Sequence, residues 1–183
     1  MISLLGRLLR RRRAGEERLA WHRPGLAAPE TIDLTSPAFA TGGPMPRRYC
    51  GDGIGDNVSP PLAWSGVPET AVELVLVVED PDVPLRRPIV HAVVTGIPAD
   101  ATGLADGEFN AGRPYGGGAG SLGRIGYAGP RPIPGHGPHA YVFQLFALDA
   151  ATDLPPGARP ERVLDAIEGH VLARGRVSGT YER

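Results

Sequence analysis

Two short stretches of the sequence carry side chains that could meet in one small pocket. The first is Asp80-Pro81-Asp82-Val83-Pro84, with His91 shortly after it. The second is Gly129-Pro130-Arg131-Pro132, followed by His139-Ala140-Tyr141. Each places a turn stiffened by proline next to a segment that carries an imidazole. Together they could supply carboxylates, two imidazoles and a phenol, which are the parts of an anion-binding site rather than of an obvious catalytic centre.

These groups suit a negatively charged ligand. The imidazoles of His91 and His139 donate hydrogen bonds and carry charge below about pH 6.5, and the hydroxyl of Tyr141 also donates. The backbone at Gly129 can approach a ligand closely and offer N–H groups. We expect Asp80 to accept an N–H of His91 and so orient that ring, because a carboxylate that faced an anion directly would repel it.

Each of these residues also has an ordinary structural interpretation. His139 and Tyr141 share one face of an extended segment and could be two rings at a partly exposed strand end. We expect His91 to share a face with Val93 and Thr95, and a lone histidine among valines is more often a satisfied core residue than a ligand group. The rigid turn at 80–84 is the feature that favours a site.

Catalysis has weaker support in the sequence. Ser121 is the only serine near these segments, and no Gly-x-Ser-x-Gly motif surrounds it. The single cysteine, Cys50, has no disulfide or metal-ligand partner in sequence and is expected to be inert. We therefore expect a non-enzymatic protein with no cofactor and no metal site, and a hydrolase is the less favoured alternative.

The composition fits a β-rich domain that does not bind nucleic acid. The chain has 183 residues, of which 42% are hydrophobic, enough to bury a core. Its 26 glycines and 20 prolines interrupt apolar runs instead of forming tracts, which favours many turns between short strands. All 19 basic residues are arginine, but the net charge of −1 gives no general attraction to polyanions.

The periodicity predicts a mostly β chain with one late helix. Apolar residues on both faces of 71–79 indicate a centrally buried strand. A helix is expected over 160–173, with Val163, Ile167 and Val171 on its apolar face. The glycine-rich stretch 103–138 shows little periodicity, which is typical of a long functional or disordered loop. The other expected strands are an edge strand over 31–39, a short strand ending near 64, and strands over 89–97, 139–148 and 175–181.

Residues 1–26 form a basic amphipathic extension, and 27–183 form the predicted β domain. The extension contains seven arginines and two glutamates, a net charge of +5, and its leucines form one helical stripe: Leu4, Leu5, Leu8 and Leu9. It could pack on its own domain or on a partner subunit, remain a mobile tail, or make weak contact with a membrane surface. Its apolar residues precede its basic run, unlike a secretory signal, and no segment approaches the roughly 18 apolar residues of a membrane span. We therefore expect a cytoplasmic protein.

The two site motifs resemble the signature regions of the phosphatidylethanolamine-binding protein family, which includes the Raf kinase inhibitor proteins and plant flowering-time regulators. The segments 57–64, 126–130 and 168–181 resemble its bacterial branch most, and the resemblance covers about residues 31–181. It implies an antiparallel β-sandwich with a small cavity that accepts phosphate, acetate or phosphorylated head groups. The residues that the resemblance places at this cavity are Asp80, Asp82, His91, Gly129, His139 and Tyr141.

The same resemblance implies a scaffold or inhibitor that forms a homodimer and has a protein partner such as a kinase or protease. An inhibitor that acts by surface contact, independently of the pocket, is the main alternative. The sequence departs from the family pattern where Pro88–Val90 precede His91, Ala92 follows it, Ala140 replaces a frequent arginine, and Arg131 replaces a proline or small residue. We expect the anion donors to be retained and the rim of the pocket to differ.

Overall fold

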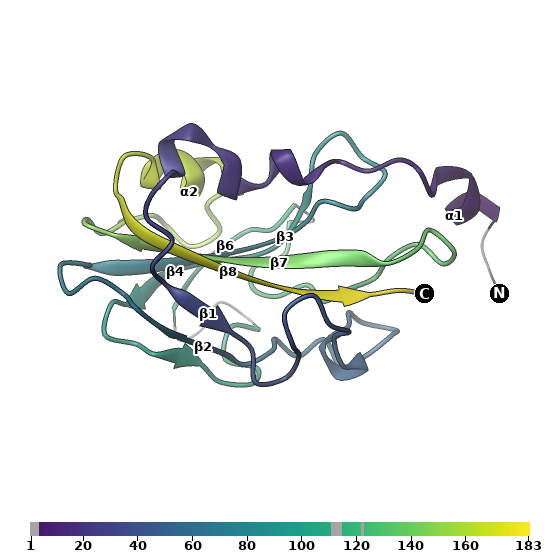
Figure 1. Cartoon of the computed structure of the whole chain (residues 1–183), viewed down its shortest axis with the longest axis horizontal. Helices are drawn as coiled ribbons and strands as arrows, with labels where there is room; N and C mark the ends of the chain where they lie inside the picture. The colour runs from purple at the N-terminus through teal and green to yellow at the C-terminus, as the bar shows by residue number, and fades with distance from the viewer. Residues whose placement is uncertain (1–3, 111–114, 122) are drawn as a thin grey trace.

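Two antiparallel sheets face each other at the centre of the molecule (Figure 1). The computed structural model describes residues 4–110, 115–121 and 123–183. The strands are β1 (Asp33–Thr35), β2 (Leu62–Ser65), β3 (Glu73–Asp80), β4 (Ile89–Pro98), β5 (Gly103–Leu104), β6 (Gly116–Gly118), β7 (His139–Leu148) and β8 (Val171–Tyr181). The larger sheet has the order β6-β4-β3-β7-β8 and the smaller sheet the order β1-β2-β5. The expected antiparallel β-sandwich is confirmed.

The central strand β3 is buried on both faces because it pairs with β4 on one side and β7 on the other. Leu74, Leu76 and Val78 point into an apolar cluster between the two sheets, whereas Val75 and Val77 point into a second cluster on the outer face. The continuous apolar run at 71–79 predicted this position. Strand β1 lies at the edge of the smaller sheet, as expected, but it is shorter than the predicted 31–39.

The N-terminal extension and the C-terminal helix α2 (Pro160–Ile167) cover the outer face of the larger sheet (Figure 1). The extension begins with the helix α1 (Leu4–Leu9) and continues through 3-10 turns within 16–26. The buried side chains of Leu19, Trp21 and Leu26 belong to the outer apolar cluster. The guanidinium of Arg174 lies 4.0 Å from the centre of the Trp21 ring. Residues 14–26 therefore pack on their own domain.

The predicted helix over 160–173 is too long. Helix α2 ends at Ile167, and β8 already begins at Val171. Gly169 has a φ angle of +79°, the left-handed conformation that terminates many helices. Val171, assigned to the helix face by its spacing, belongs to a strand that pairs along the whole of β7. The last strand is accordingly longer than the predicted 175–181.

The glycine-rich stretch 103–138 contains the short strands β5 and β6, and its later part reaches back to the end of β3. Tyr127 in this stretch is buried and donates its hydroxyl hydrogen to the carbonyl oxygen of Tyr49 at 2.9 Å. The neighbouring Cys50 is also buried, and burial raises the pKa of its thiol to about 11. A thiol with that pKa carries little thiolate at neutral pH, as expected for an inert side chain.

Candidate functional site

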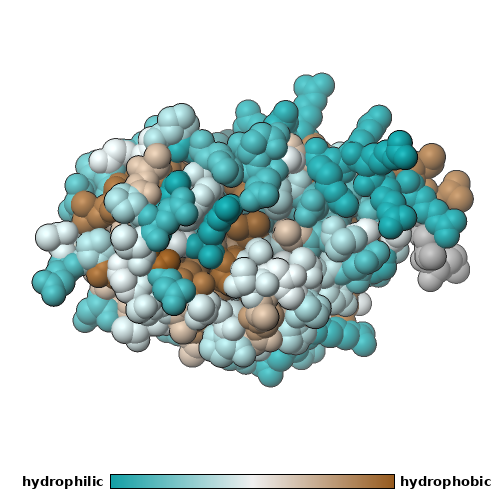
Figure 2. All heavy atoms as spheres, viewed as in Figure 1, coloured by the Kyte–Doolittle hydropathy of each residue, from teal (hydrophilic) through white to brown (hydrophobic). Residues whose placement is uncertain are grey.

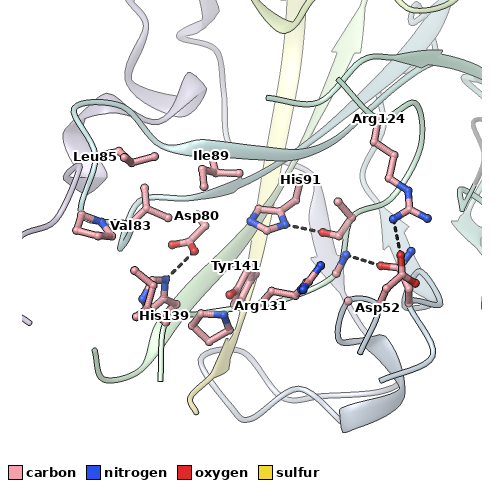
Figure 3. A pocket seen from close by; sticks show the side chains of 17 residues that line it. Asp52, Asp80, Val83, Leu85, Ile89, His91, Arg124, Arg131, His139 and Tyr141 are labelled. Carbon is pink, nitrogen blue, oxygen red and sulfur yellow. Dashed lines mark hydrogen bonds and ion pairs between the residues drawn. The ribbon is translucent and has the colours of Figure 1, made fainter. Parts of the chain in front are cut away.

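The polar residues of the two sequence motifs meet at one end of the larger sheet. Because β4 and β7 both run antiparallel to β3, the end of β3 at Asp80 lies beside the first residues of both neighbours. A cavity of about 430 Å³ opens there (Figure 3). The turn at 83–85 and the segment 128–133 complete its walls.

Five of the six predicted site residues line this cavity: Asp80, His91, Gly129, His139 and Tyr141. Asp82 is not part of the lining. Its carboxylate accepts the backbone N–H of Ala140 at 2.7 Å and lies 3.3 Å from the guanidinium of Arg13. The proline-stiffened turn therefore directs Asp82 away from the cavity, toward β7 and the N-terminal extension.

A β-bulge turns His91 toward the cavity. The register of the β3–β4 ladder shifts after Val78, and His91 has no cross-strand partner there. Its ring meets Tyr141 edge to face, with ring centroids 5.0 Å apart. Val93 packs instead in the outer apolar cluster. The expectation that His91 and Val93 share a face is wrong, because strict alternation does not allow for a bulge.

The backbone of Ala128, just before the second motif, orients the ring of His91, and no carboxylate does so. Its Nδ1 hydrogen-bonds the carbonyl oxygen of Ala128 (Figure 3). A carbonyl can only accept, so Nδ1 carries a proton. The carboxylate of Asp80 contacts His139 instead. The expectation that Asp80 orients His91 is therefore wrong.

Two polar atoms on the cavity wall have no hydrogen-bond partner among the described residues: Nε2 of His91 and the hydroxyl oxygen of Tyr141. His91 is 6% exposed and Tyr141 is 1% exposed. Most buried polar groups are hydrogen-bonded, and an unsatisfied one costs about 1–3 kcal/mol. Two such atoms on neighbouring rings leave hydrogen-bond capacity unused at the cavity wall.

Burial changes the proton affinity of both groups. It lowers the pKa of His91, although the Ala128 carbonyl and the charge of Asp80 oppose the shift. It raises the pKa of Tyr141, and the nearby Asp80 raises it further. The backbone N–H of Arg131 opposes this rise in the pKa, but it is not placed to form a hydrogen bond with the hydroxyl. Near pH 7 His91 is thus neutral with an acceptor at Nε2, and Tyr141 is a neutral donor.

A chain of hydrogen bonds leads from the cavity to the N-terminal helix. Asp80 Oδ2 lies 2.7 Å from Nδ1 of His139, and Nε2 of His139 lies 2.8 Å from Nδ1 of His136. Nε2 of His136 in turn donates to the carbonyl oxygen of Leu9 at 2.9 Å. Arg13 also contacts Nδ1 of His136 at 2.9 Å. The three side chains at the centre of this chain are buried.

The donors and acceptors in this chain fix most of its protons. A guanidinium only donates, so Nδ1 of His136 is an acceptor, and its Nε2 carries the proton given to Leu9. Nε2 of His139 must then be the donor to His136. One further proton lies between His139 and the Asp80 carboxylate, so this buried pair is neutral overall.

Gly129 allows two segments of the cavity wall to pack closely. Its backbone N–H donates to Oδ1 of Asn57 at 2.8 Å, so the expected offer of this N–H to an anion is wrong. A Cβ atom at this position would lie 2.3 Å from the carbonyl oxygen of Tyr49. Only glycine allows such a close approach of the two chain segments.

Sequence reasoning named Arg131 among the changes at the rim, and Arg131 does line the cavity, but it missed His136, Asn57, Asp52 and Arg124. His136 lies three residues before His139 in a Gly-His-Gly context, and that spacing alone carried no signal of a contact. Arg124 lines the cavity and pairs with Asp52 at 2.7 Å (Figure 3). Among the described residues, no three His, Cys, Asp or Glu side chains are placed to hold a metal ion.

The fold belongs to a known class of binding proteins. The profile of the phosphatidylethanolamine-binding protein family matches residues 35–182. A UPF0098 protein of Methanothermobacter thermautotrophicus is 45% identical over 155 residues, which cover 83% of this chain and 99% of that protein. The chain belongs to the phosphatidylethanolamine-binding protein family.

Solved structures agree with this assignment. The family homolog CT736 from Chlamydia trachomatis superimposes with a TM-score of 0.76 at 37% identity, covering 84% of this chain and 99% of CT736. YbcL from E. coli gives the same TM-score and coverage at 29% identity. The expected family, with its bacterial members, and the expected fold are confirmed.

The compartment and the partners stay predictions. No helix in the described ranges is long and apolar enough to cross a membrane. A Mycobacterium tuberculosis protein that carries the name lipoprotein LppC is 42% identical over 157 residues, covering 85% of this chain and 74% of LppC. Cytoplasmic location, the homodimer and a kinase or protease partner are not tested by these similarities.

Proposed function

We propose that this chain is a binding protein whose pocket holds a small phosphorylated anion without transforming it. The observation that carries the proposal is a pair of buried atoms on the cavity wall, Nε2 of His91 and the hydroxyl of Tyr141, that have no hydrogen-bond partner in the described part of the chain. A ligand between the two rings would give both atoms a partner. The family description supports this class of ligand, since phosphatidylethanolamine carries a phosphorylated head group.

The two atoms require different partners. The hydroxyl of Tyr141 can donate, whereas Nε2 of a neutral His91 can only accept. A phosphate monoanion, or a singly ionised phosphate monoester, keeps at least one P–OH group, so it offers an acceptor oxygen to Tyr141 and a donor to His91. An anion with no proton of its own binds only when His91 takes up a proton at Nε2.

The charges around the cavity favour such a ligand. The pair of His139 and Asp80 is neutral overall, so the Asp80 carboxylate adds no net negative charge to the wall. Arg131 is exposed at the rim, whereas Arg124, also at the rim, is paired with Asp52 at 2.7 Å. Arginine is well suited to phosphate because its planar group donates two parallel hydrogen bonds.

Binding is favoured over hydrolysis by the residues on the wall. No Ser, Thr or Cys side chain belongs to the described lining of the cavity. The hydroxyl oxygen of Ser121 accepts the backbone N–H of Val90 at 2.8 Å, outside this lining. We therefore propose no covalent step at this site.

A titration with inorganic phosphate and with phosphorylethanolamine, followed through the imidazole ¹⁵N signals, tests the proposal. We expect saturable shifts at His91 near pH 6.5. His91→Ala and Tyr141→Phe should each weaken binding by about tenfold or more, because a hydrogen bond to a charged group contributes about 1.5–3 kcal/mol. Equal affinity for the two ligands would show that the phosphate alone is recognised.

The matched control is His170→Ala. His170 is exposed and pairs with Asp149 at 2.8 Å, and it does not line the cavity. Its removal should leave phosphate binding unchanged. The proposal is wrong if His91 shows no saturable shift, or if His170→Ala weakens binding as much as His91→Ala.

A further inference from the structure

The helix α1 exposes an apolar edge. Six large apolar side chains are exposed in the part of the chain that the structure describes, and half of them lie on α1: Leu4 at 78%, Leu5 at 55% and Leu8 at 75%. With about 100° between successive residues of a helix, these leucines lie on one side. Gly6 lies on the other side, where a Cβ atom would be 2.1 Å from the carbonyl oxygen of Pro134. The glycine therefore packs against the protein, and the leucines point away from it.

Positive charge surrounds this apolar edge. Arg7, Arg10, Arg11 and Arg12 are exposed. None of them forms an ion pair with a described residue, and no acidic residue occurs within 4–13. Figure 2 shows hydrophobic side chains beside strongly hydrophilic ones at the end of the molecule where Figure 1 places α1.

We propose that residues 4–13 dock the protein on bilayers that contain anionic lipids. Exposed leucines entering the interfacial region, with arginines among anionic head groups, are the features of helices that lie on membranes. A protein groove is a poorer match, because a helix of six residues offers less than two turns of contact. Residues 14–26 pack on the sheet, so the docking element ends near Arg13.

The docking element is fixed to the wall of the pocket. The carbonyl oxygen of Leu9, the last residue of α1, accepts a hydrogen bond from His136 at 2.9 Å. His136 contacts His139, which lines the cavity, at 2.8 Å. Docking would thus hold the pocket near the bilayer, but it does not depend on what the pocket binds.

Sedimentation with vesicles tests the proposal on the full chain. We expect binding to vesicles of phosphatidylcholine mixed with phosphatidylglycerol, little binding to phosphatidylcholine alone, and a loss of binding at high salt. Changing Arg7, Arg10, Arg11 and Arg12 together to Gln should weaken binding more than a hundredfold, since each arginine near an anionic surface contributes roughly fivefold. Changing Leu4, Leu5 and Leu8 together to Ser should weaken it about tenfold or more.

The matched control changes to Gln the same number of exposed arginines elsewhere that form no ion pair with a described residue: Arg86, Arg159, Arg162 and Arg183. It carries the same change in net charge and should retain most of the binding. The proposal is overturned by no sedimentation, by equal sedimentation on neutral vesicles, or by an equal loss in the control. His91→Ala should sediment like the unchanged protein, and a loss there would assign vesicle binding to the pocket instead. Thermal melting checks that each variant is folded.

Discussion

Glu79 and Asp80 are consecutive buried carboxylates on β3, yet their surroundings differ in one respect. Glu79 faces the outer layer, where it accepts the backbone N–H of Ala20 at 2.7 Å and the side-chain N–H of Gln144 at 2.8 Å. Asp80 faces the cavity and contacts His139. Around Glu79 the polar atoms have partners, whereas Nε2 of His91 and the hydroxyl of Tyr141, on the cavity wall near Asp80, have none among the described residues.

The comparison shows what separates a structural polar cluster from the proposed binding site. Both carboxylates are buried, at 4% and 2% exposure, so burial of charge does not distinguish them. Glu79 and Gln144 join the N-terminal extension to the sheet, since Gln144 accepts the backbone N–H of Trp21 at 2.7 Å. Of these two places, only the surroundings of Asp80 contain polar atoms beside a cavity that form no hydrogen bond with the described residues.

The largest expected effect is the removal of the Asp80 carboxylate. Asp80→Ala leaves the buried Nδ1 of His139 without a partner and removes the acceptor of the Asp82 backbone N–H. We expect a loss of about 3 kcal/mol in the free energy of unfolding, measured by urea denaturation. Asp80→Asn should lower the free energy of unfolding much less, because its amide N–H can donate to Nδ1 of a neutral His139. Equal losses in the two variants would contradict the neutral pair.

The second prediction concerns the pH dependence of sulfate binding. Burial lowers the pKa of His91, and sulfate brings no proton, so sulfate binds only to the minor protonated form of the ring. Its affinity should fall as pH rises above 6.5, approaching about tenfold per pH unit. Phosphate can supply its own proton and should show a shallower slope between pH 5.5 and its second ionisation near pH 7.

Calorimetric titrations at several pH values measure both slopes. His91→Ala should abolish the difference between sulfate and phosphate, whereas His170→Ala should leave it unchanged. A sulfate affinity that does not vary with pH would rule out proton uptake by His91.

Tyr141→Phe should act in opposite directions on stability and binding. The hydroxyl has no hydrogen-bond partner in the described structure, so its removal breaks none and relieves a buried unsatisfied group. We expect the free energy of unfolding to rise by about 1 kcal/mol while phosphate binding weakens. Tyr127→Phe is the contrasting variant, because its buried hydroxyl donates to Tyr49 and its loss should destabilise. A destabilised Tyr141→Phe would mean that the hydroxyl already has a partner.

The convergence of the site could be predicted because antiparallel neighbours place the end of one strand beside the beginnings of the next. The apolar runs at 71–79 and 139–148 predicted β3 and β7, and with them the meeting of Asp80 with His139 and Tyr141. Local hydrogen bonding could not be predicted in the same way. A bulge at His91 and a side-chain acceptor from Asn57 depend on contacts with residues far away in sequence.

The smaller errors in the sequence-based predictions also arise from contacts with residues that are distant in sequence. The spacing of apolar residues predicted a helix that continues to residue 173. Val171 fits the apolar face of such a helix as well as it fits strand β8, which it joins. The three-residue spacing of His136 and His139 predicts nothing until the turn between them brings the rings together. Periodicity reports which face is buried, whereas the partner of each polar atom is set by tertiary packing.

The last prediction addresses the Glu79 side of the comparison through its pH dependence. Burial raises the pKa of Glu79 above 4.5, although Ala20 and Gln144 oppose the shift, so the folded state holds this proton more tightly than the unfolded state. The resulting stabilisation is present at low pH and is lost as pH rises from 4.5 through the raised pKa. Glu79→Gln keeps an acceptor for both N–H donors and cannot ionise. Its stability relative to the unchanged protein should therefore increase as pH rises over this range, in urea denaturation at successive pH values. Glu69→Gln, at an exposed position, should show no such trend. If the stability of Glu79→Gln instead changed with pH in parallel with that of the unchanged protein, the Glu79 carboxylate would be as well stabilised inside the protein as in water.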